Sequence, residues 1–323
     1  MDRILRQLTP PELAVHGAVG GDHPGRPEAR SGVGGRRIVG MRVGMVSAGN
    51  GPVLAVEREG RWYQWSPPGE IPVRSGWSAL DVLALGERVQ ADGMLHPSRL
   101  LPPIVPHRNV ICLGKNYRAH AEEFAAYEGA EKSVPEAPIV FTKPAAALCG
   151  ARDVVTVEQR VTAALDYEAE LGVVIGAGGA HIPAEDAERH VAGYMIINDI
   201  TARDLQRRHG QWFLGKSLHH ATPAGPVIVS ATELTDLAAR SIRCWVNDEL
   251  RQEAKLGEMI FGVAETIAEI SRIFPLEPGD LIAMGTPSGV GVGFKPPRYL
   301  HDGDRVVCEI DGIGRLDNTI RLG

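Results

Sequence analysis

Short runs of apolar residues, some alternating with polar ones, dominate the chain from residue 109 onward. Runs of about four to eight residues bounded by Gly, Pro, Asn or Asp are typical of β-strands. We predict strands at 109–113, 139–142, 168–175, 193–198, 227–229, 241–246, 281–284, 305–310 and 314–321. Helical periodicity is strong only over 261–273, where Val263, Ile267, Ile270 and Ile273 would form one buried stripe.

The pattern changes twice before residue 109. Residues 1–40 include a stretch dense in Gly, Arg and Pro, which has too few apolar residues to form a core and predicts a disordered extension. Residues 41–103 carry short strand signals and a helix at 78–85 with Ser78 as its N-cap, and predict a small β domain. Prolines at 102, 103 and 106 mark its end. The remainder, 104–323, reads as an α+β domain that is mainly β, without the regular βαβ alternation of Rossmann or TIM folds.

Composition narrows the function classes. The chain has 323 residues, 44% of them hydrophobic and 23% charged, as in ordinary soluble proteins. A net charge of −6 argues against nucleic acid as a partner, and no apolar run approaches the roughly 20 residues of a membrane span. The amino terminus lacks the apolar core of a secretory signal, so we expect a cytoplasmic protein. The scattered Cys112, Cys149, Cys244 and Cys308 are interpreted as buried, reduced thiols in preference to disulfides or zinc ligands.

The candidate chemistry begins with two carboxylates. Glu168 and Glu170 would share one strand face, with Cα atoms roughly 6.5–7 Å apart, so that both side chains can reach one cation. The alternative is a solvated strand face, which needs no metal. Asp199 ends another apolar strand, where an unpaired carboxylate is costly, and is a natural third ligand unless Arg203 or a turn explains it. Three carboxylates predict Mg²⁺ or Mn²⁺ rather than zinc.

Three further segments carry polar groups that suit catalysis. His120 and Glu123 would lie on one face of a helix, where Glu123 can orient His120 as a general base, although a surface His–Glu pair is the simpler alternative. Lys216 can neutralise a carboxylate or an oxyanion. The Gly-rich turn 285–291, with Thr286, can hold such a group through its backbone amides. Neither this turn nor 215–217 has the spacing of a nucleotide-binding P-loop.

Five motifs in order resemble the fumarylacetoacetate hydrolase family, which includes acylpyruvases, decarboxylases, isomerases and lyases. They are GKNYRAHAEE (114–123), DYEAEL (166–171), INDITARD (197–204), GKS (215–217) and GTPSGVG (285–291). The resemblance spans residues 109–323. It implies a mixed β-sandwich roll behind a small N-terminal β domain, and a homodimer.

The resemblance also implies roles for individual residues. The metal ligands would be Glu168, Glu170 and Asp199. The catalytic residues would be His120, Glu123 and Lys216, and the substrate-binding residues would be Lys143, Arg203, Gln206 and Thr286. The chain departs from the family pattern at 145–147 and 218–220, beside the expected pocket, which leaves the substrate open.

These residues predict a metal-dependent enzyme for a small keto acid. The leading hypothesis is hydrolysis of a C–C bond in a 2,4-diketo acid, in which His120 and Glu123 activate water and the metal stabilises the enolate. The alternatives are decarboxylation or tautomerisation of a 2-oxo acid such as oxaloacetate or a homocatechuate-pathway intermediate, and lyase activity on a ureido acid. A non-catalytic binding protein on the same fold would need no base at His120.

Overall fold

The structure, a computed structural model, describes residues 41–48, 51–66, 78–85, 90–129 and 134–323. These residues all fall within one compact unit. The predicted disordered extension, residues 1–40, lies outside them. Within the described ranges, no helix has the length and apolar character needed to cross a membrane.

The first part of the described chain is antiparallel sheet with one helix, α1 (Ala79–Leu85). Its strands are β1 (Arg42–Ala48), β2 (Gly51–Arg58), β3 (Arg61–Ser66), β4 (Gln90–Leu95) and β5 (Arg99–Leu101). Ser78 caps α1 as predicted, because its Oγ accepts a hydrogen bond from the Asp81 amide at 3.4 Å. Strand β1 also pairs with β14 (Thr222–Ser230), so the sheet continues past the proline-rich boundary. The division into domains at residue 103 stays a prediction.

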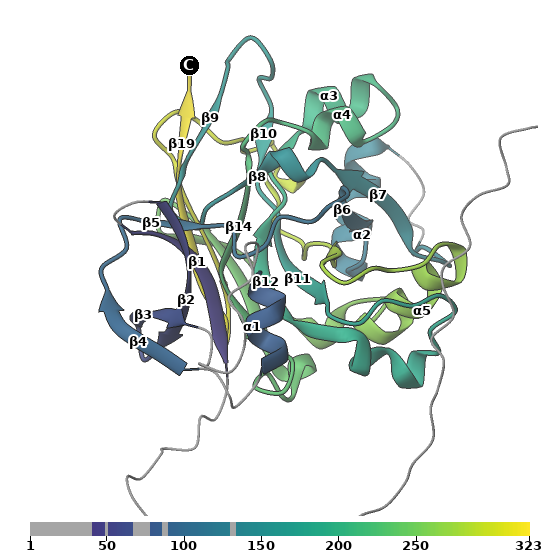
Figure 1. The fold of residues 1–323 in the computed structure, drawn as a ribbon. Coiled ribbons are helices and arrows are strands. Elements are labelled where there is room, and N and C mark those ends of the chain that lie inside the picture. Colours follow the sequence, from purple (N-terminus) through teal and green to yellow (C-terminus); the bar gives the residue numbers. More distant parts are fainter. Residues whose placement is uncertain (1–40, 49–50, 67–77, 86–89, 130–133) are drawn as a thin grey trace, which may run out of the picture. The chain divides into compact units, whose positions relative to one another are not determined.

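The large sheet is mixed. Its order is β4-β3-β2-β1-β14-β12-β11-β17-β6-β7, with β5 beside β1 and β8 beside β14 (Figure 1). The further strands are β6 (Val110–Gly114), β7 (Ile139–Lys143), β8 (Leu148–Cys149), β11 (Ala169–Ile175), β12 (Val191–Asn198) and β17 (Leu281–Ala283). Strand β17 lies between β6 and β11, parallel to β6 and antiparallel to β11.

A second sheet, ordered β16-β15-β18-β19-β9, packs against the first. Its strands are β9 (Val154–Val157), β15 (Ser241–Val246), β16 (Glu249–Lys255), β18 (Arg305–Ile310) and β19 (Gly314–Leu322). Strands β11 and β12 contact β15, β18 and β19 across the interface, and one apolar cluster joins Leu171 and Val173 to Ile242 and Val306. The predicted mainly β, mixed-sheet fold class is confirmed.

Helices and short elements connect these strands. The helices are α2 (Arg118–Glu128), α3 (Arg203–Arg208), α4 (Phe213–Lys216) and α5 (Val263–Ile273). The 3₁₀ turns are η2 (Ala145–Ala147), η3 (Ala184–His190), η4 (Leu237–Ala239), η5 (Leu256–Glu258) and η6 (Gly291–Gly293). Ile267 and Ile270 of α5 are buried as predicted, but Ile273 is 67% exposed because the helix ends there.

The cysteine side chains lie in the core. Cys112, Cys149, Cys244 and Cys308 are all buried and free. Burial raises the pKa of the Cys149 thiol to about 12 and that of Cys112 well above its usual value, so both stay protonated at neutral pH. This arrangement agrees with the interpretation of the cysteines as buried thiols.

Candidate active site

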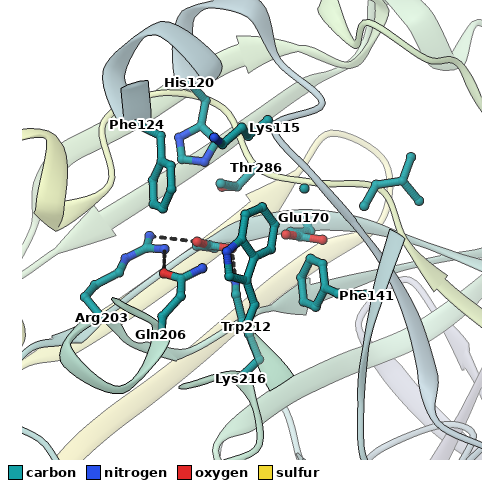
Figure 2. A pocket seen from close by; sticks show the side chains of 13 residues that line it. Lys115, His120, Phe124, Phe141, Glu170, Arg203, Gln206, Trp212, Lys216 and Thr286 are labelled. Carbon is teal, nitrogen blue, oxygen red and sulfur yellow. Dashed lines mark hydrogen bonds and ion pairs between the residues drawn. The ribbon is translucent and has the colours of Figure 1, made fainter. Parts of the chain in front are cut away.

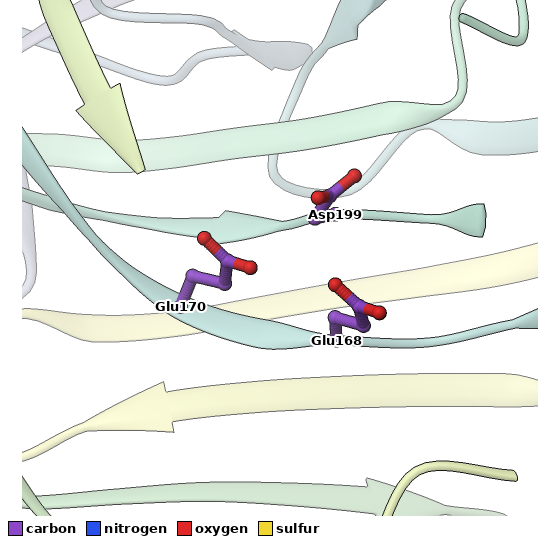
Figure 3. Close-up of side chains that lie close together, drawn as sticks. All are labelled: Glu168, Glu170 and Asp199. Atoms are coloured by element: carbon purple, nitrogen blue, oxygen red, sulfur yellow. The ribbon is translucent and has the colours of Figure 1, made fainter. Parts of the chain in front are cut away.

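The three predicted carboxylates converge at the end of two paired strands. In the antiparallel pair β11–β12, Ala169 lies opposite Asn198, so the residues just outside the pair, Glu168 and Asp199, also become neighbours. The Asp199 amide donates to the Glu168 carbonyl at 2.8 Å, and the Glu168 amide donates to Asn198 Oδ1 at 3.0 Å. One oxygen from each of Glu168, Glu170 and Asp199 lies within 4.8 Å of the other two (Figure 3).

Two buried lysines hold Asp199. Lys216, at the end of α4, donates from Nζ to Asp199 Oδ2 at 2.7 Å and to Glu168 Oε2 at 2.6 Å. Lys143, at the end of β7, donates to Asp199 Oδ1 and, at 2.9 Å, to the Ile200 carbonyl. Both oxygens of Asp199 are therefore bound by ammonium groups.

Arg203 occupies the other side of Glu168. Its guanidinium lies 2.7 Å from Glu168 Oε1, donates from Nε to Asp166 Oδ2 at 2.8 Å, and donates from Nη1 to Gln206 Oε1 at 3.1 Å. Asp166 also accepts hydrogen bonds from the amides of Gly291 and Val292 at 2.7 and 3.0 Å. Arg203 and Asp166 thus connect the acidic cluster to the Gly-rich turn.

The two glutamates differ in their electrostatic surroundings. Burial alone would raise the pKa of Glu168, but the positive charges of Lys216 and Arg203 outweigh it and lower that pKa to about 2. Burial raises the pKa of Glu170 well above its usual value, and repulsion from Asp199 and Glu168 raises it further. Glu168 is therefore charge-compensated, whereas Glu170 is not.

This donor set fits a hard divalent cation. Glu170 accepts a hydrogen bond from the Gly285 amide at 2.9 Å, and no lysine or arginine of the described residues forms an ion pair with it. A buried carboxylate in this position has unused oxygen lone pairs beside two further carboxylates. Oxygen-only ligands of this kind suit Mg²⁺ or Mn²⁺. Glu168, Glu170 and Asp199 are the residues that could hold such an ion.

Glu168 and Glu170 face a hollow (Figure 2). Its lining consists of Leu113, Gly114, Lys115, His120, Phe124, Phe141, Glu168, Glu170, Arg203, Gln206, Trp212, Lys216 and Thr286. The structure thus brings together all but three of the predicted site residues at this surface. Asp199 and Lys143 lie behind it, and Glu123 lies behind His120. The roles assigned to these residues stay predictions.

His120 stands on α2 beside the Gly-rich turn. Its Nδ1 lies 3.3 Å from Glu123 Oε2, and only 5% of His120 is exposed. Glu123 also accepts a hydrogen bond from the Gly289 amide at 3.1 Å. A Cβ atom on Gly293 would lie 1.9 Å from Glu123 Oε1, so a larger residue there would have to displace the Glu123 side chain. Glu123 therefore contacts both His120 and the Gly-rich turn.

Aromatic side chains form an apolar wall that the sequence reasoning missed. Trp212 makes edge-on contacts with Phe141 and Phe124, at centroid distances of 5.3 and 6.1 Å. A Cβ atom on Gly114 would lie 2.2 Å from the Trp212 ring, so that glycine makes room for the wall. Phe124 directly follows the motif 114–123 and Trp212 lies three residues before Gly215, and that proximity is the signal that could have found them. Phe141 lies outside the quoted motifs.

A buried amide, Gln252, was also missed. It reaches the site from β16, a strand of the second sheet, and contacts Thr286 and the backbone of β11. Its own segment, ELRQEAK, is mostly polar and does not mark Gln252 as an inward-pointing residue. Only the packing of the two sheets identifies it.

Comparisons with known proteins agree with this geometry. Residues 109–321 match the family model described as fumarylacetoacetate (FAA) hydrolase C-terminal. The oxaloacetate tautomerase YisK of Bacillus subtilis is 50% identical over 215 residues, which are 67% of this chain and 70% of that protein.

Solved structures show the same fold. The fumarylacetoacetate hydrolase of Exiguobacterium antarcticum is 38% identical with a TM-score of 0.75, over 88% of this chain and all of that one. The 2-hydroxyhepta-2,4-diene-1,7-dioate isomerase of Mycobacterium marinum is 30% identical with a TM-score of 0.69, over 87% of this chain and 98% of that one. The chain therefore belongs to the fumarylacetoacetate hydrolase family.

Proposed function

We propose that this protein catalyses keto–enol tautomerisation of a small 2-oxo dicarboxylic acid such as oxaloacetate. The observation that carries the proposal is that His120, in contact with Glu123, lines the same hollow as Glu168 and Glu170, two members of a carboxylate cluster that could hold a cation. Tautomerisation needs only a proton carrier and a means of stabilising an enolate, and both groups are present. The similarity to a tautomerase at 50% identity supports this choice among the activities of the family.

His120 is the proton carrier in this proposal. A carboxylate only accepts hydrogen bonds, so the contact with Glu123 favours a proton on Nδ1 of the neutral ring and leaves Nε2 as the base. His120 Nε2 then takes a proton from the carbon beside the ketone, and the imidazolium returns that proton to the enolate oxygen to give the enol. The enol-to-keto reaction runs the same two transfers in reverse. Glu123 stabilises the imidazolium formed in between.

Polar groups in the hollow suit the acid groups of the substrate. Gln206 Oε1 already accepts from Arg203, so the Gln206 NH₂ group is left as a donor at the surface of the hollow. Thr286 lines the same surface. Hydrogen-bond donors and the guanidinium of Arg203 match carboxylate oxygens, and they would hold the end of the substrate that does not react.

We also propose Mg²⁺ or Mn²⁺ as the cofactor, held by Glu168, Glu170 and Asp199. Such an ion supplies Lewis acidity that polarises the 2-oxo group and stabilises negative charge in the enolate. Activity should disappear with EDTA and return when either metal is added. Activity that survives full removal of the metal contradicts this assignment.

Hydrolysis of a 2,4-diketo acid is the second candidate. It is favoured by the same His120–Glu123 pair, which could activate a water molecule, and by the likeness to a fumarylacetoacetate hydrolase at 38% identity. The two reactions differ in stoichiometry. Hydrolysis consumes one water and releases two acids, whereas tautomerisation gives an isomer with the same atoms as the substrate.

One experiment separates the candidates. The purified protein with Mg²⁺ is mixed with freshly dissolved oxaloacetate or with an acylpyruvate, and proton NMR follows both the keto/enol ratio and any cleavage products. Accelerated keto–enol exchange without products supports tautomerisation, and cleavage of the acylpyruvate supports the second candidate. His120→Ala should lose either activity by roughly 10²–10⁴-fold while Mg²⁺ still binds. The exposed His301→Ala serves as control. Unchanged turnover in the His120 variant excludes His120 as the base.

We further propose a cytoplasmic homodimer, with residues 41–103 as a small N-terminal domain. Unpaired thiols suit a reducing compartment. Exposed apolar residues gather on the edge strand β7 and on neighbouring α4, namely Ile139, Val140, Phe213 and Leu214. Such a surface suits burial against a second copy, and light scattering of the purified protein tests it.

A further inference from the structure

Gln252 is a buried amide that bridges the two sheets beneath the hollow. It comes from β16 and is 0% exposed. Its Oε1 accepts a hydrogen bond from the Ala169 amide at 3.1 Å, and its Nε2 donates to Thr286 Oγ1 and to the Pro287 carbonyl, both at 2.8 Å. Ala169 stands between the two glutamates of the acidic cluster. Gln252 therefore connects the strand that carries the glutamates to the threonine that lines the hollow.

The orientation of this amide is fixed by its partners. A backbone N–H can only donate, so the atom that faces Ala169 must be the amide oxygen. A carbonyl can only accept, so the atom that faces Pro287 must be the NH₂ group. Rotating the amide by 180° would place two donors against each other at one end and two acceptors at the other. The hydrogen bond to Thr286 is therefore donated by Gln252.

This direction determines what Thr286 can offer a ligand. Because Thr286 Oγ1 accepts from Gln252, its own proton cannot point toward Gln252 and remains free to donate. Among the described residues no acceptor is found for that proton, although Thr286 is only 2% exposed. Thr286 lines the hollow, so the proton left free by Gln252 can be donated to a group in the space that a substrate would fill (Figure 2).

We propose that Gln252 is a positioning residue that sets Thr286 as a hydrogen-bond donor to an anionic oxygen of the substrate. The assignment deepens, and rests on, the proposed tautomerisation of a 2-oxo dicarboxylic acid. A hydroxyl donor at this position favours substrate groups that accept a hydrogen bond, such as carboxylate or enolate oxygens, over groups that only donate one. Gln252 itself does not line the hollow and acts through Thr286.

The test exchanges the donor and acceptor in the hydrogen bond between residue 252 and Thr286. In Gln252→Glu, one oxygen of an ionised carboxylate keeps the contact with Ala169 and the other accepts the Thr286 proton, which removes the donor from the hollow. The second oxygen also loses the hydrogen bond to the Pro287 carbonyl and faces it as a second acceptor. Gln252→Met keeps the volume and leaves the hydroxyl free to rotate. We expect KM for oxaloacetate to rise roughly ten- to hundredfold in Gln252→Glu, and less than tenfold in Gln252→Met.

A double-mutant cycle separates positioning from general damage. In a Thr286→Val background there is no hydroxyl to orient, so Gln252→Glu should raise KM no further. Equal effects of Gln252→Glu with and without the hydroxyl would overturn the proposal. If Gln252→Glu does not fold, the cycle is run with Gln252→Met, and an unchanged KM in that variant is the contradicting result. Asn318→Leu, which removes a buried amide of β19 that binds the carbonyls of Gly150 and Asp153, is the matched control and should leave KM unchanged.

Binding of oxalate makes the result independent of turnover. Oxalate is a dianion that resembles a 2-oxo acid enolate, and calorimetry with Mg²⁺ measures its affinity for each variant. If oxalate binding weakens in Gln252→Glu only when Thr286 is present, the inference stands even where wild-type protein does not act on oxaloacetate. If wild-type protein tautomerises oxaloacetate but the Gln252 variants bind oxalate as tightly as wild type, the proposed function stands and this inference fails. Failure of oxalate to bind the Mg²⁺-loaded wild type also contradicts it.

Discussion

Replacing Lys216 by methionine tests whether the acidic cluster is a cation site. Lys216 is 2% exposed and its ammonium lies 2.6 Å from Glu168 Oε2 and 2.7 Å from Asp199 Oδ2. Lys216→Met keeps most of the aliphatic volume but leaves two buried carboxylates without this shared partner. We therefore expect the metal-free protein to lose stability.

The magnitude follows from the burial of the pair. Removing one partner of a buried ion pair costs about 3–5 kcal/mol, because the remaining charge is left in a poorly solvated site. Arg203 and Lys143 still compensate part of the negative charge, so we expect the lower end, about 3 kcal/mol. A divalent ion can replace the missing positive charge, and it no longer competes with an ammonium group for the same oxygens. Tenfold tighter Mg²⁺ binding in the variant would recover about 1.4 kcal/mol.

Urea unfolding followed by fluorescence, in EDTA and in saturating Mg²⁺, measures both effects. The difference in the free energy of unfolding between wild type and variant should be about 3 kcal/mol in EDTA, and it should be smaller by at least about 1 kcal/mol in Mg²⁺. Arg108→Met is the control, since Arg108 pairs with the buried Asp280 outside the cluster and its effect should not depend on metal. An equal loss of stability in both conditions would refute the reasoning that a divalent ion takes over the charge of Lys216. No stabilisation of the wild type by Mg²⁺ would refute a cation site in the cluster.

Three further predictions concern single groups. Glu170→Gln should weaken Mg²⁺ binding at least tenfold by calorimetry while raising the metal-free unfolding midpoint, because burial and neighbouring carboxylates already disfavour its charge. Gly293→Ala should lower kcat in the tautomerase assay, because the added methyl group meets Glu123 and displaces it from His120. Burial opposes ionisation of Asp153, but the hydrogen bond from Arg99 lowers its pKa below the ordinary value of 3.8. The pair therefore stabilises the fold above pH 3.8, and this stabilisation is lost as the pH falls through the folded pKa. The free energy of unfolding of Asp153→Asn should accordingly converge with that of wild type below about pH 3.8.

Each of these predictions has a result that would contradict it. Unchanged Mg²⁺ affinity in the Glu170 variant removes that residue from the ligand set. Gly262→Ala is the control for Gly293, since a Cβ atom there has nothing nearer than 4.0 Å, and equal kcat losses in both would show a general effect of the methyl group. A constant stability difference across the whole acid range would mean that Asp153 does not act through its charge.

Much of the fold was predictable because strand signals are local. Predicted strands such as 241–246 and 305–310 agree with β15 and β18 residue for residue. Strand 227–229 was too short, since β14 begins at Thr222 and contains two prolines that the sequence pattern reads as interruptions. Strand order was beyond reach, because the placement of β17 between β6 and β11 depends on packing across the whole sheet.

Some residues of the candidate site could likewise be predicted from the sequence, and others could not. Glu168, Glu170 and Asp199 could be predicted to converge because strand spacing and the ends of buried strands are visible in the sequence. Lys143 was expected at the substrate, yet it reaches Asp199 from behind the hollow; the direction of a side chain at a strand end is set by its neighbours. Gln252 could not be found, because it lies in a polar segment of the other sheet.

The position of β17 has a consequence for synthesis of the chain. Translation delivers β6, β11 and β12 with all three carboxylates and both lysines before residue 281 exists, so until then the edges of β6 and β11 that will pair with β17 lack their partner. The turn that carries Thr286 and meets Glu123 and Asp166 arrives later still. The centre therefore cannot be completed while the ribosome still holds the last third of the chain. A transcript that ends early would yield an acidic cluster beside open strand edges, which is a target for chaperones and proteases rather than a slower enzyme.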